Sequence, residues 1–151
     1  MQPGGPAVND DAPVVSHADG EIDAPVEDVW RILTAIEQWP TWNPDVRSAS
    51  INGPVAEGAT FRWKAGPGTI TSAVTHVERP RLIAWTGRTL GISAVHVWRL
   101  EERDGLTHVR TEESYEGLVA RILRRPLQKT LDTALTGGVR HLRAAAERGT
   151  R

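Results

Sequence analysis

The chain has 151 residues, of which 39% are hydrophobic and 25% are charged, as expected for one soluble globular domain. It contains no cysteine, which excludes disulfide bonds, a thiolate nucleophile and cysteine-ligated metals. The formal net charge is −1, but residues 117–151 carry eight basic and two acidic side chains. We interpret this excess as the solvated face of a helix rather than as a site for nucleic acid or a membrane.

The N-terminal segment is rich in Pro, Gly and Asp and carries little apolar area, so we expect residues 1–13 to be disordered. It lacks the basic start and apolar centre of a signal peptide. No run of the chain approaches the roughly 18 apolar residues of a transmembrane helix. We therefore expect a cytoplasmic protein with no integral membrane association, folded as one domain over residues 14–148.

The folded part begins with a strand expected over residues 14–22, followed by a helix that Pro25 opens. The apolar face of that helix consists of Val26, Val29, Trp30 and Leu33. A short helical segment over residues 36–42 follows. It ends in the sequence WPTWNP at residues 39–44, where two prolines prevent further helix.

Between residues 45 and 116, short runs of β-branched and aromatic residues alternate with turn signals, which is typical of β-hairpins. Strands are expected at residues 46–51, 59–65, 69–78, 81–88, 92–101 and 106–115. Consecutive strands without an intervening helix form an antiparallel meander. Together with residues 14–22, they predict a seven-stranded antiparallel sheet.

The last long segment, residues 118–148, is predicted to be an amphipathic helix. Its apolar stripe contains Ile122, Leu123, Leu127, Leu131, Leu135, Val139 and Leu142. Pro126 should kink or break the helix, and Gly137-Gly138 should permit close contact with a neighbour. The sequence thus predicts an α+β fold with two short helices after the first strand and a curved sheet around a long C-terminal helix, with a cavity between them.

The Asp104-Gly105 pair predicts a two-residue type I′ turn, which fixes the register of the last hairpin. The predicted partners are Leu100 with Val109, Trp98 with Thr111, His96 with Glu113, and Ala94 with Tyr115. These residues are mostly apolar and the intervening ones are charged, as expected if one face is buried. His96 and Glu113 should therefore be neighbours on the concave face.

The same reasoning at Gly66-Pro67-Gly68 places Phe61 opposite Val74 and Trp63 opposite Ser72, and Val74 should lie beside Trp85. The predicted concave face then carries Phe61, Trp63, Ser72, Val74, Trp85, His96, Trp98, Thr111, Glu113 and Tyr115. A β-bulge would shift part of this set by one residue.

Four segments together resemble the START-like (SRPBCC) helix-grip superfamily, specifically its bacterial polyketide cyclase/dehydrase-like members. They are residues 22–30 (IDAPVEDVW), 39–44 (WPTWNP), 96–101 (HVWRLE) and 111–118 (TEESYEGL). The resemblance covers about residues 14–147 and implies the helix-grip fold. It also implies a hydrophobic or aromatic ligand, polyketide- or lipid-like, between the sheet and the C-terminal helix. The superfamily includes cyclases, carriers and chaperone activators and has no single catalytic motif to carry over.

The sequence contains no nucleophile elbow, phosphate-binding loop or histidine pair with metal-ligand spacing, so we expect neither a metal nor a cofactor. His96 with Glu113 is the pair that could transfer protons as general base and acid. Tyr115, Thr111 or Ser72 could donate a hydrogen bond to an enolate oxygen. The alternative is a buried His–Glu contact that only satisfies two polar groups.

Large aromatic residues supply most of the expected ligand site. The candidate ligand-binding residues are Trp39, Trp42, Phe61, Trp63, Ser72, Trp85, Trp98, Thr111, Tyr115 and Leu135. Trp39 and Trp42 are expected at the cavity mouth, whereas Trp30 is expected in the core. Trp63, Trp85 and Trp98 could form either a cavity wall or solid core.

Three function classes follow from these patterns. The first is a protein that binds a hydrophobic small molecule without chemistry, and the second is an enzyme that cyclises or dehydrates a polyketide-like substrate. The third is a protein-interaction or chaperone-cofactor module, which would require an exposed apolar patch. An acid/base group inside the pocket distinguishes the second class from the first, and His96 with Glu113 is the candidate pair.

Overall fold

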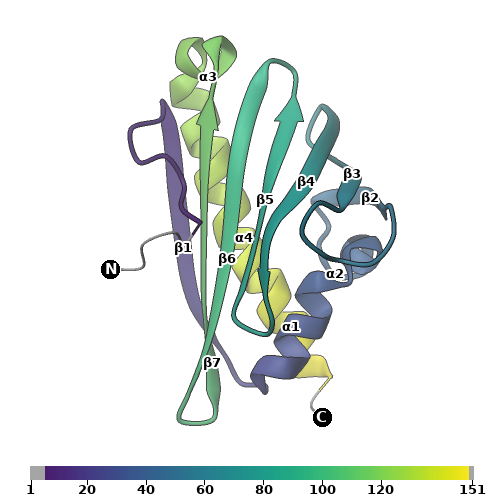
Figure 1. Cartoon of the computed structure of the whole chain (residues 1–151). Coiled ribbons are helices and arrows are strands. Elements are labelled where there is room, and N and C mark those ends of the chain that lie inside the picture. The colour runs from purple at the N-terminus through teal and green to yellow at the C-terminus, as the bar shows by residue number, and fades with distance from the viewer. Residues whose placement is uncertain (1–5, 150–151) are drawn as a thin grey trace.

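The computed structural model describes residues 6–149, which form an α+β fold with one antiparallel sheet in the order β1-β7-β6-β5-β4-β3-β2. The strands are β1 (Val14–Ile22), β2 (Val46–Ile51), β3 (Thr60–Ala65), β4 (Gly68–Glu78), β5 (Leu82–Thr89), β6 (Ile92–Arg103) and β7 (Leu106–Glu116). The helices are α1 (Val26–Thr34), η1 (Ile36–Gln38), α2 (Trp39–Trp42), α3 (Leu118–Ile122) and α4 (Arg124–Arg148). The sheet curves around α4 (Figure 1), which confirms the predicted fold class.

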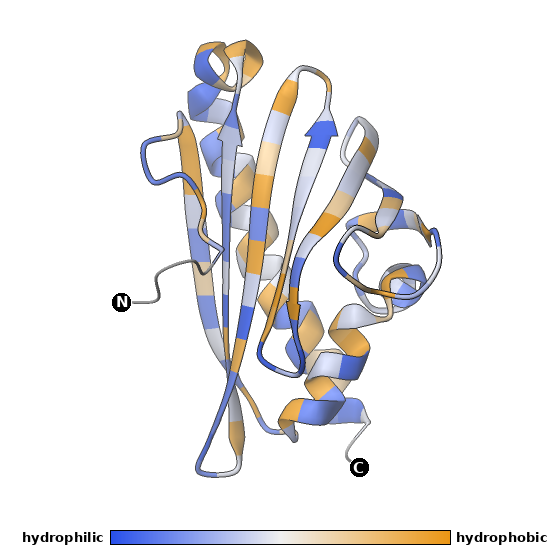
Figure 2. Cartoon of the chain, in the orientation of Figure 1, coloured by the Kyte–Doolittle hydropathy of each residue, from blue (hydrophilic) through white to orange (hydrophobic). Residues whose placement is uncertain are grey.

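The apolar stripe of α4 packs on the concave face of the sheet. Its buried residues include Leu131, Leu135, Val139 and Leu142, which share one core with Trp85 and Trp98 of the sheet. Each fully buried leucine contributes roughly 1.5–3 kcal/mol. Hydrophobic and hydrophilic residues alternate along the strands (Figure 2), as expected for a sheet with one buried face. No helix within residues 6–149 is long and apolar enough to cross a membrane.

The β6–β7 register is the predicted one, with His96 opposite Glu113 and Trp98 opposite Thr111. Asp104 and Gly105 have φ angles of 54° and 80°, the two positive values that a type I′ turn requires. The turn therefore determines which side chains of this hairpin face α4.

The predicted β3–β4 partners were wrong by two residues. Phe61 lies opposite Ser72, and Trp63 lies opposite Ile70. The two central residues of the turn are Gly66, with φ 69°, and Pro67. A two-residue hairpin turn of type I′ or II′ needs a positive φ at its first central residue, and proline's fixed negative φ excludes it from that position. A shift of two residues keeps every side chain on its predicted face.

The β4–β5 pairing of Val74 with Trp85 is confirmed, and a bulge follows directly after Val74. Of residues 1–13, which we expected to be disordered, residues 1–5 lie outside the described residues, and residues 6–13 lie on the outer side of the sheet. Val8 is buried against Leu82, Ala84 and Val97. It covers apolar residues on the convex face that would otherwise contact water.

The C-terminal helix begins again close to Pro126, as predicted. Leu123 separates α3 from α4 with non-helical angles of φ −101° and ψ 28°. Pro126 is in the first turn of α4, where a missing N–H donor costs nothing. This interruption sets α3 apart as a short helix at one end of the sheet (Figure 1).

The two glycines of α4 differ in what they touch. A Cβ at Gly138 would lie 3.6 Å from Cη2 of Trp98, so this glycine packs against the sheet as predicted. A Cβ at Gly137 would instead be 3.9 Å from the side chains of Asp45, Arg140 and His141. The expectation that both glycines lie against the sheet or a ligand therefore holds for Gly138 alone.

We predict that Gly138→Leu lowers the free energy of unfolding by about 1–3 kcal/mol or more, because the added methyl groups would displace Trp98. Gly138→Ala should be neutral or slightly stabilising, since one methyl group fits at ordinary contact distance. Urea unfolding measures both, with the exposed Arg140→Leu change as the control. Equal stability of Gly138→Leu and Arg140→Leu would contradict the packing.

Candidate functional site

The β6–β7 hairpin contributes polar side chains to a row of residues that lies beneath α4. Across β1, β7, β6, β5 and β4 the row reads Ser16, Glu113, His96, Trp85 and Val74. Thr111 and Trp98 form the next pair on one side, and Tyr115 and Ala94 form the next pair on the other. The predicted acid/base pair is thus brought together on the concave face.

His96 is buried between two indole rings. Its ring centroid lies 4.9 Å from that of Trp85 and 5.6 Å from that of Trp98. Its Nε2 lies 2.8 Å from the Thr111 hydroxyl oxygen, which fixes the orientation of the imidazole. On the opposite side of the ring, Nδ1 lies 3.3 Å from Oε1 of Glu113, without the alignment of a hydrogen bond.

Burial favours the neutral form of both partners. It raises the pKa of Glu113 to about 8 and lowers the pKa of His96 to about 3. At pH 7 Glu113 is therefore mostly a carboxylic acid and His96 is an uncharged imidazole. A proton on Nε2 of His96 would be donated to the Thr111 hydroxyl and would leave Nδ1 as an acceptor.

Tyr115 is a third polar group on this face. Burial, and then the charge of Glu113, raise the pKa of its phenol above the ordinary range, so the hydroxyl stays protonated. Tyr115 faces Ala94, which faces Gly87, and Gly87 faces Ser72. Short side chains therefore occupy the concave face between Tyr115 and Phe61, the partner of Ser72.

One end of the concave face is only partly covered, and we call it the half-open end. Its side chains are half-buried, whereas those towards the other end are buried. The half-open end is formed by Trp63, Ile70, Ile92, Ala94 and Tyr115. It leads directly to the row that contains Glu113 and His96.

The remaining aromatic residues form a packed cluster. Trp39 contacts Phe61, Trp63 and Trp85 at centroid distances of 5.6, 5.3 and 5.4 Å. It is 4% exposed, and its Nε1 donates to the Leu33 carbonyl, so Trp39 is core and does not lie at a cavity mouth as expected. Its place at the start of α2 turns the ring inwards over the sheet.

Hollows in the surface lie elsewhere. One, of about 340 Å³, is bordered by residues of β2, β3 and the start of β4, including Trp63. Another, of about 430 Å³, lies on the outer side of β1, β6 and β7, around Arg99 and Arg110. Between α4 and the sheet, where we expected an open cavity, Phe61, Trp85, Trp98 and Leu135 are buried in one core.

Four buried nitrogens have no hydrogen-bond partner within the described residues. They are Nε1 of Trp42, Nε1 of Trp98, Nδ1 of His76 and Nδ1 of His96. A buried polar group without a partner costs about 1–3 kcal/mol. Such atoms are available to a polar group of a ligand. Trp63, by contrast, donates its Nε1 hydrogen to Ser72.

A second polar cluster, which the sequence patterns did not predict, joins β1 to α4. The Ser16 hydroxyl donates to Asp132 over 2.5 Å, and Gln128 donates to Asp132 and to the Val15 carbonyl. Ser16 is also the strand partner of Glu113. The alternation of β1 could have revealed it, because Ser16 shares the face of Val14 and Ala18. Within residues 6–149 no cluster of three metal-ligating side chains occurs.

We predict that the buried carboxyl makes the stability of the fold depend on pH. Between pH 6.5 and 8, folded Glu113 holds a proton that the unfolded chain releases near pH 4.5, so stability falls as pH rises. Across that window the wild type should lose about 2 kcal/mol relative to Glu113→Gln. Urea unfolding at several pH values measures this difference. Glu112→Gln, on the opposite face of β7, should follow the wild type. If the free energy of unfolding changed with pH in the same way for the wild type and Glu113→Gln, Glu113 could not be protonated in the folded state.

Comparison with known structures shows the same fold in several bacterial proteins. A hypothetical protein of Helicobacter pylori is 15% identical, covers 91% of this chain and 90% of its own, and has a TM-score of 0.81. The Zhui aromatase/cyclase of a Streptomyces species is 16% identical, covers 91% and 95%, and has a TM-score of 0.79. A Thermus thermophilus protein is 17% identical, covers 91% and 99%, and has a TM-score of 0.78.

Comparison with curated proteins gave no match. A family model does match, and it spans residues 14–147, which is nearly the whole described chain. The match confirms the family resemblance seen in the sequence. This chain belongs to the polyketide cyclase/dehydrase and lipid transport family.

Proposed function

We propose that the protein binds a hydrophobic small molecule, polyketide- or lipid-like, at the half-open end of the concave face. The observation that carries this proposal is the Glu113–His96 pair at the inner limit of a row of short side chains, with His96 packed between Trp85 and Trp98. Family membership and the fold shared with an aromatase/cyclase support it.

The site suits a ligand that is mainly apolar and carries a few polar atoms. Ala94 and Gly87 contribute little side chain to this end of the face. Ile70, the strand partner of Trp63, lies over Gly87, where a Cβ would be 3.2 Å from Cγ2 of Ile70. A ligand carbonyl that reaches inwards could accept a hydrogen bond from Nε1 of Trp98, and a ligand hydroxyl could donate one to Nδ1 of His96. A hydrogen bond between the ligand and these atoms would recover part of the free energy lost on burying them, which favours binding.

The same pair can also carry out acid/base chemistry on a bound β-hydroxyketone. His96 Nδ1 would take the proton from the carbon next to the carbonyl, and Glu113 would protonate the departing hydroxyl, which leaves as water. The product is a carbon–carbon double bond, and the pair is left as imidazolium and carboxylate. Transfer of one proton across their 3.3 Å separation restores the starting state.

Ligand binding can be followed by tryptophan fluorescence, because Trp63, Trp85 and Trp98 lie around the proposed site. We expect planar polycyclic phenols to quench the fluorescence saturably. Ala94→Leu should weaken binding about tenfold or more by filling the row of short side chains. Ala134→Leu makes the same change on the exposed face of α4 and should bind as the wild type does. Equal ligand affinity of these two variants would show that the ligand does not bind at the half-open end.

Catalysis can be separated from binding with Glu113→Gln, which keeps the shape of the protonated side chain but cannot donate as an acid. Turnover of a poly-β-ketone thioester should fall about a hundredfold or more, while ligand affinity stays near that of the wild type. Glu112→Gln is the control on the outer face. Unchanged turnover in Glu113→Gln would exclude the catalytic role and leave binding in place.

A further inference from the structure

The large hydrophobic side chains that are exposed within residues 6–149 gather at one end of the molecule. They are Leu118 and Ile122, each 69% exposed, Leu90 at 61% and Leu123 at 47%. Leu90 lies in the β5–β6 turn, and the other three belong to α3 or follow it directly. We call these four residues the apolar tip; its two segments form the same end of the fold (Figures 1 and 2).

Close packing joins the two segments of the apolar tip. A Cβ at Gly117 would lie 2.7 Å from the Gly91 carbonyl oxygen, and a Cβ at Gly91 would lie 2.9 Å from Val119 of α3. Only glycine permits this approach, so the turn and α3 are held against each other. The exposed leucines and isoleucine therefore form one surface.

Leu90 occupies a backbone conformation that does not suit it. Its φ is 49°, and Gly91 follows with φ 78°, as in a type I′ turn. The β6–β7 turn, at the opposite end of the sheet, has similar angles and uses the favoured pair Asp104-Gly105. A leucine at this position stores strain and contacts water, so folding alone does not account for it.

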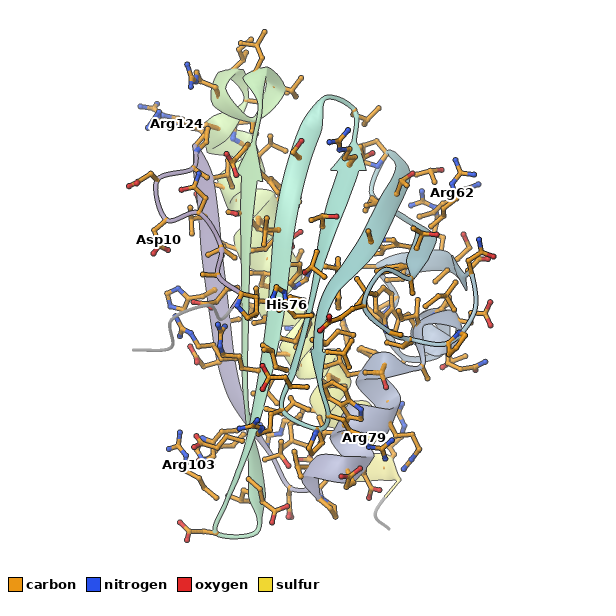
Figure 3. The ribbon with its side chains drawn as sticks, in the orientation of Figure 1. Asp10, Arg62, His76, Arg79, Arg103 and Arg124 are labelled. Carbon is orange, nitrogen blue, oxygen red and sulfur yellow. The ribbon has the colours of Figure 1, made fainter. Side chains whose placement is uncertain are left out.

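Basic side chains outnumber acidic ones around the apolar tip, where Glu116 is the nearest acid in the sequence. Residues 117–131 contain four basic side chains and no acidic one, and Arg88 lies two residues before Leu90. The ion pairs recorded within the described residues include none of Arg88, Arg121, Arg124, Arg125 or Lys129. Arg79 and Arg103, by contrast, pair with acids at the other end of the molecule (Figure 3).

We propose that the apolar tip docks on an anionic lipid bilayer, with Leu90, Leu118, Ile122 and Leu123 entering the interface and the surrounding cations binding lipid phosphates. Exposed apolar residues next to several arginines are the combination that binds such surfaces. Docking of a second copy through the tip would bring two sets of like charges together, which opposes self-association. Nucleic acid would use the arginines but would leave the apolar side chains in water.

Docking would also place the half-open end of the concave face next to the bilayer. Ile92 of that end follows Leu90-Gly91 directly, and Tyr115 lies two residues before Gly117. A hydrophobic ligand could then pass between lipid and protein without crossing water. This last step rests on the proposed function, whereas docking itself does not require a ligand.

The test is cosedimentation of the full chain, without ligand, with phosphatidylcholine vesicles that contain half phosphatidylglycerol. We expect binding that is weak on pure phosphatidylcholine and is lost in 0.5 M salt. Arg121→Gln/Arg124→Gln/Arg125→Gln should reduce the affinity about 100-fold. Leu118→Ser/Ile122→Ser should reduce it about tenfold or more, because two apolar side chains no longer enter the interface.

Two controls separate docking from general effects. Arg79→Gln/Arg103→Gln/Arg140→Gln removes the same charge away from the tip and should bind within about twofold of the wild type. Leu90→Asn suits the turn, so it should raise the thermal unfolding midpoint while weakening vesicle binding about fivefold. Absence of wild-type binding, or equal binding by the tip and control variants, would overturn the proposal. So would dimerisation through the tip without vesicle binding. Ligand titration without vesicles tests the proposed function separately.

Discussion

The Asp104-Gly105 turn is the constraint on which the interior depends. It fixes the β6–β7 register, and the register decides whether His96, Trp98, Thr111 and Glu113 face α4 or the solvent. A slip of one residue would bring the charged neighbours Arg99 and Glu112 beneath the apolar stripe of the helix. Neither could be buried there without a large desolvation cost. The stripe of α4 and the turn therefore select the same register.

The interior that this register creates is not the most stable one available. Two ionisable groups lie under α4, and burial keeps both of them neutral rather than allowing an ion pair. Nδ1 of His96 and Nε1 of Trp98 add unsatisfied atoms. Apolar residues of similar volume would cost less to bury. The polar row is therefore better explained by a role with a ligand than by a contribution to folding.

The sequence determined the strands and the acid/base pair because each rests on local chemistry. Strict alternation and an Asp-Gly turn were sufficient to place His96 opposite Glu113. The β3–β4 partners were wrong because Gly66 and Pro67, rather than Pro67 and Gly68, occupy the turn. Packing beyond the hairpins was harder to predict from the sequence, since the size of the side chains on the concave face decides whether a curved sheet encloses a cavity. Trp39, expected at an opening, instead contacts three aromatic rings.

The two ends of the sheet make different use of the same turn geometry. At the β6–β7 end, an aspartate takes the positive φ at little cost, and nearby arginines pair with acids. At the β5–β6 end, a leucine takes the same conformation with its side chain in water. Within residues 6–149 the basic residues of α3 and early α4 form no ion pair with an acid. Strain, apolar exposure and unbalanced charge arise from segments far apart in the chain, and they coincide at the end where the concave face is half-open. Independent costs of folding are not expected to gather at one place by chance, and an anionic, apolar surface is the environment that would offset all three.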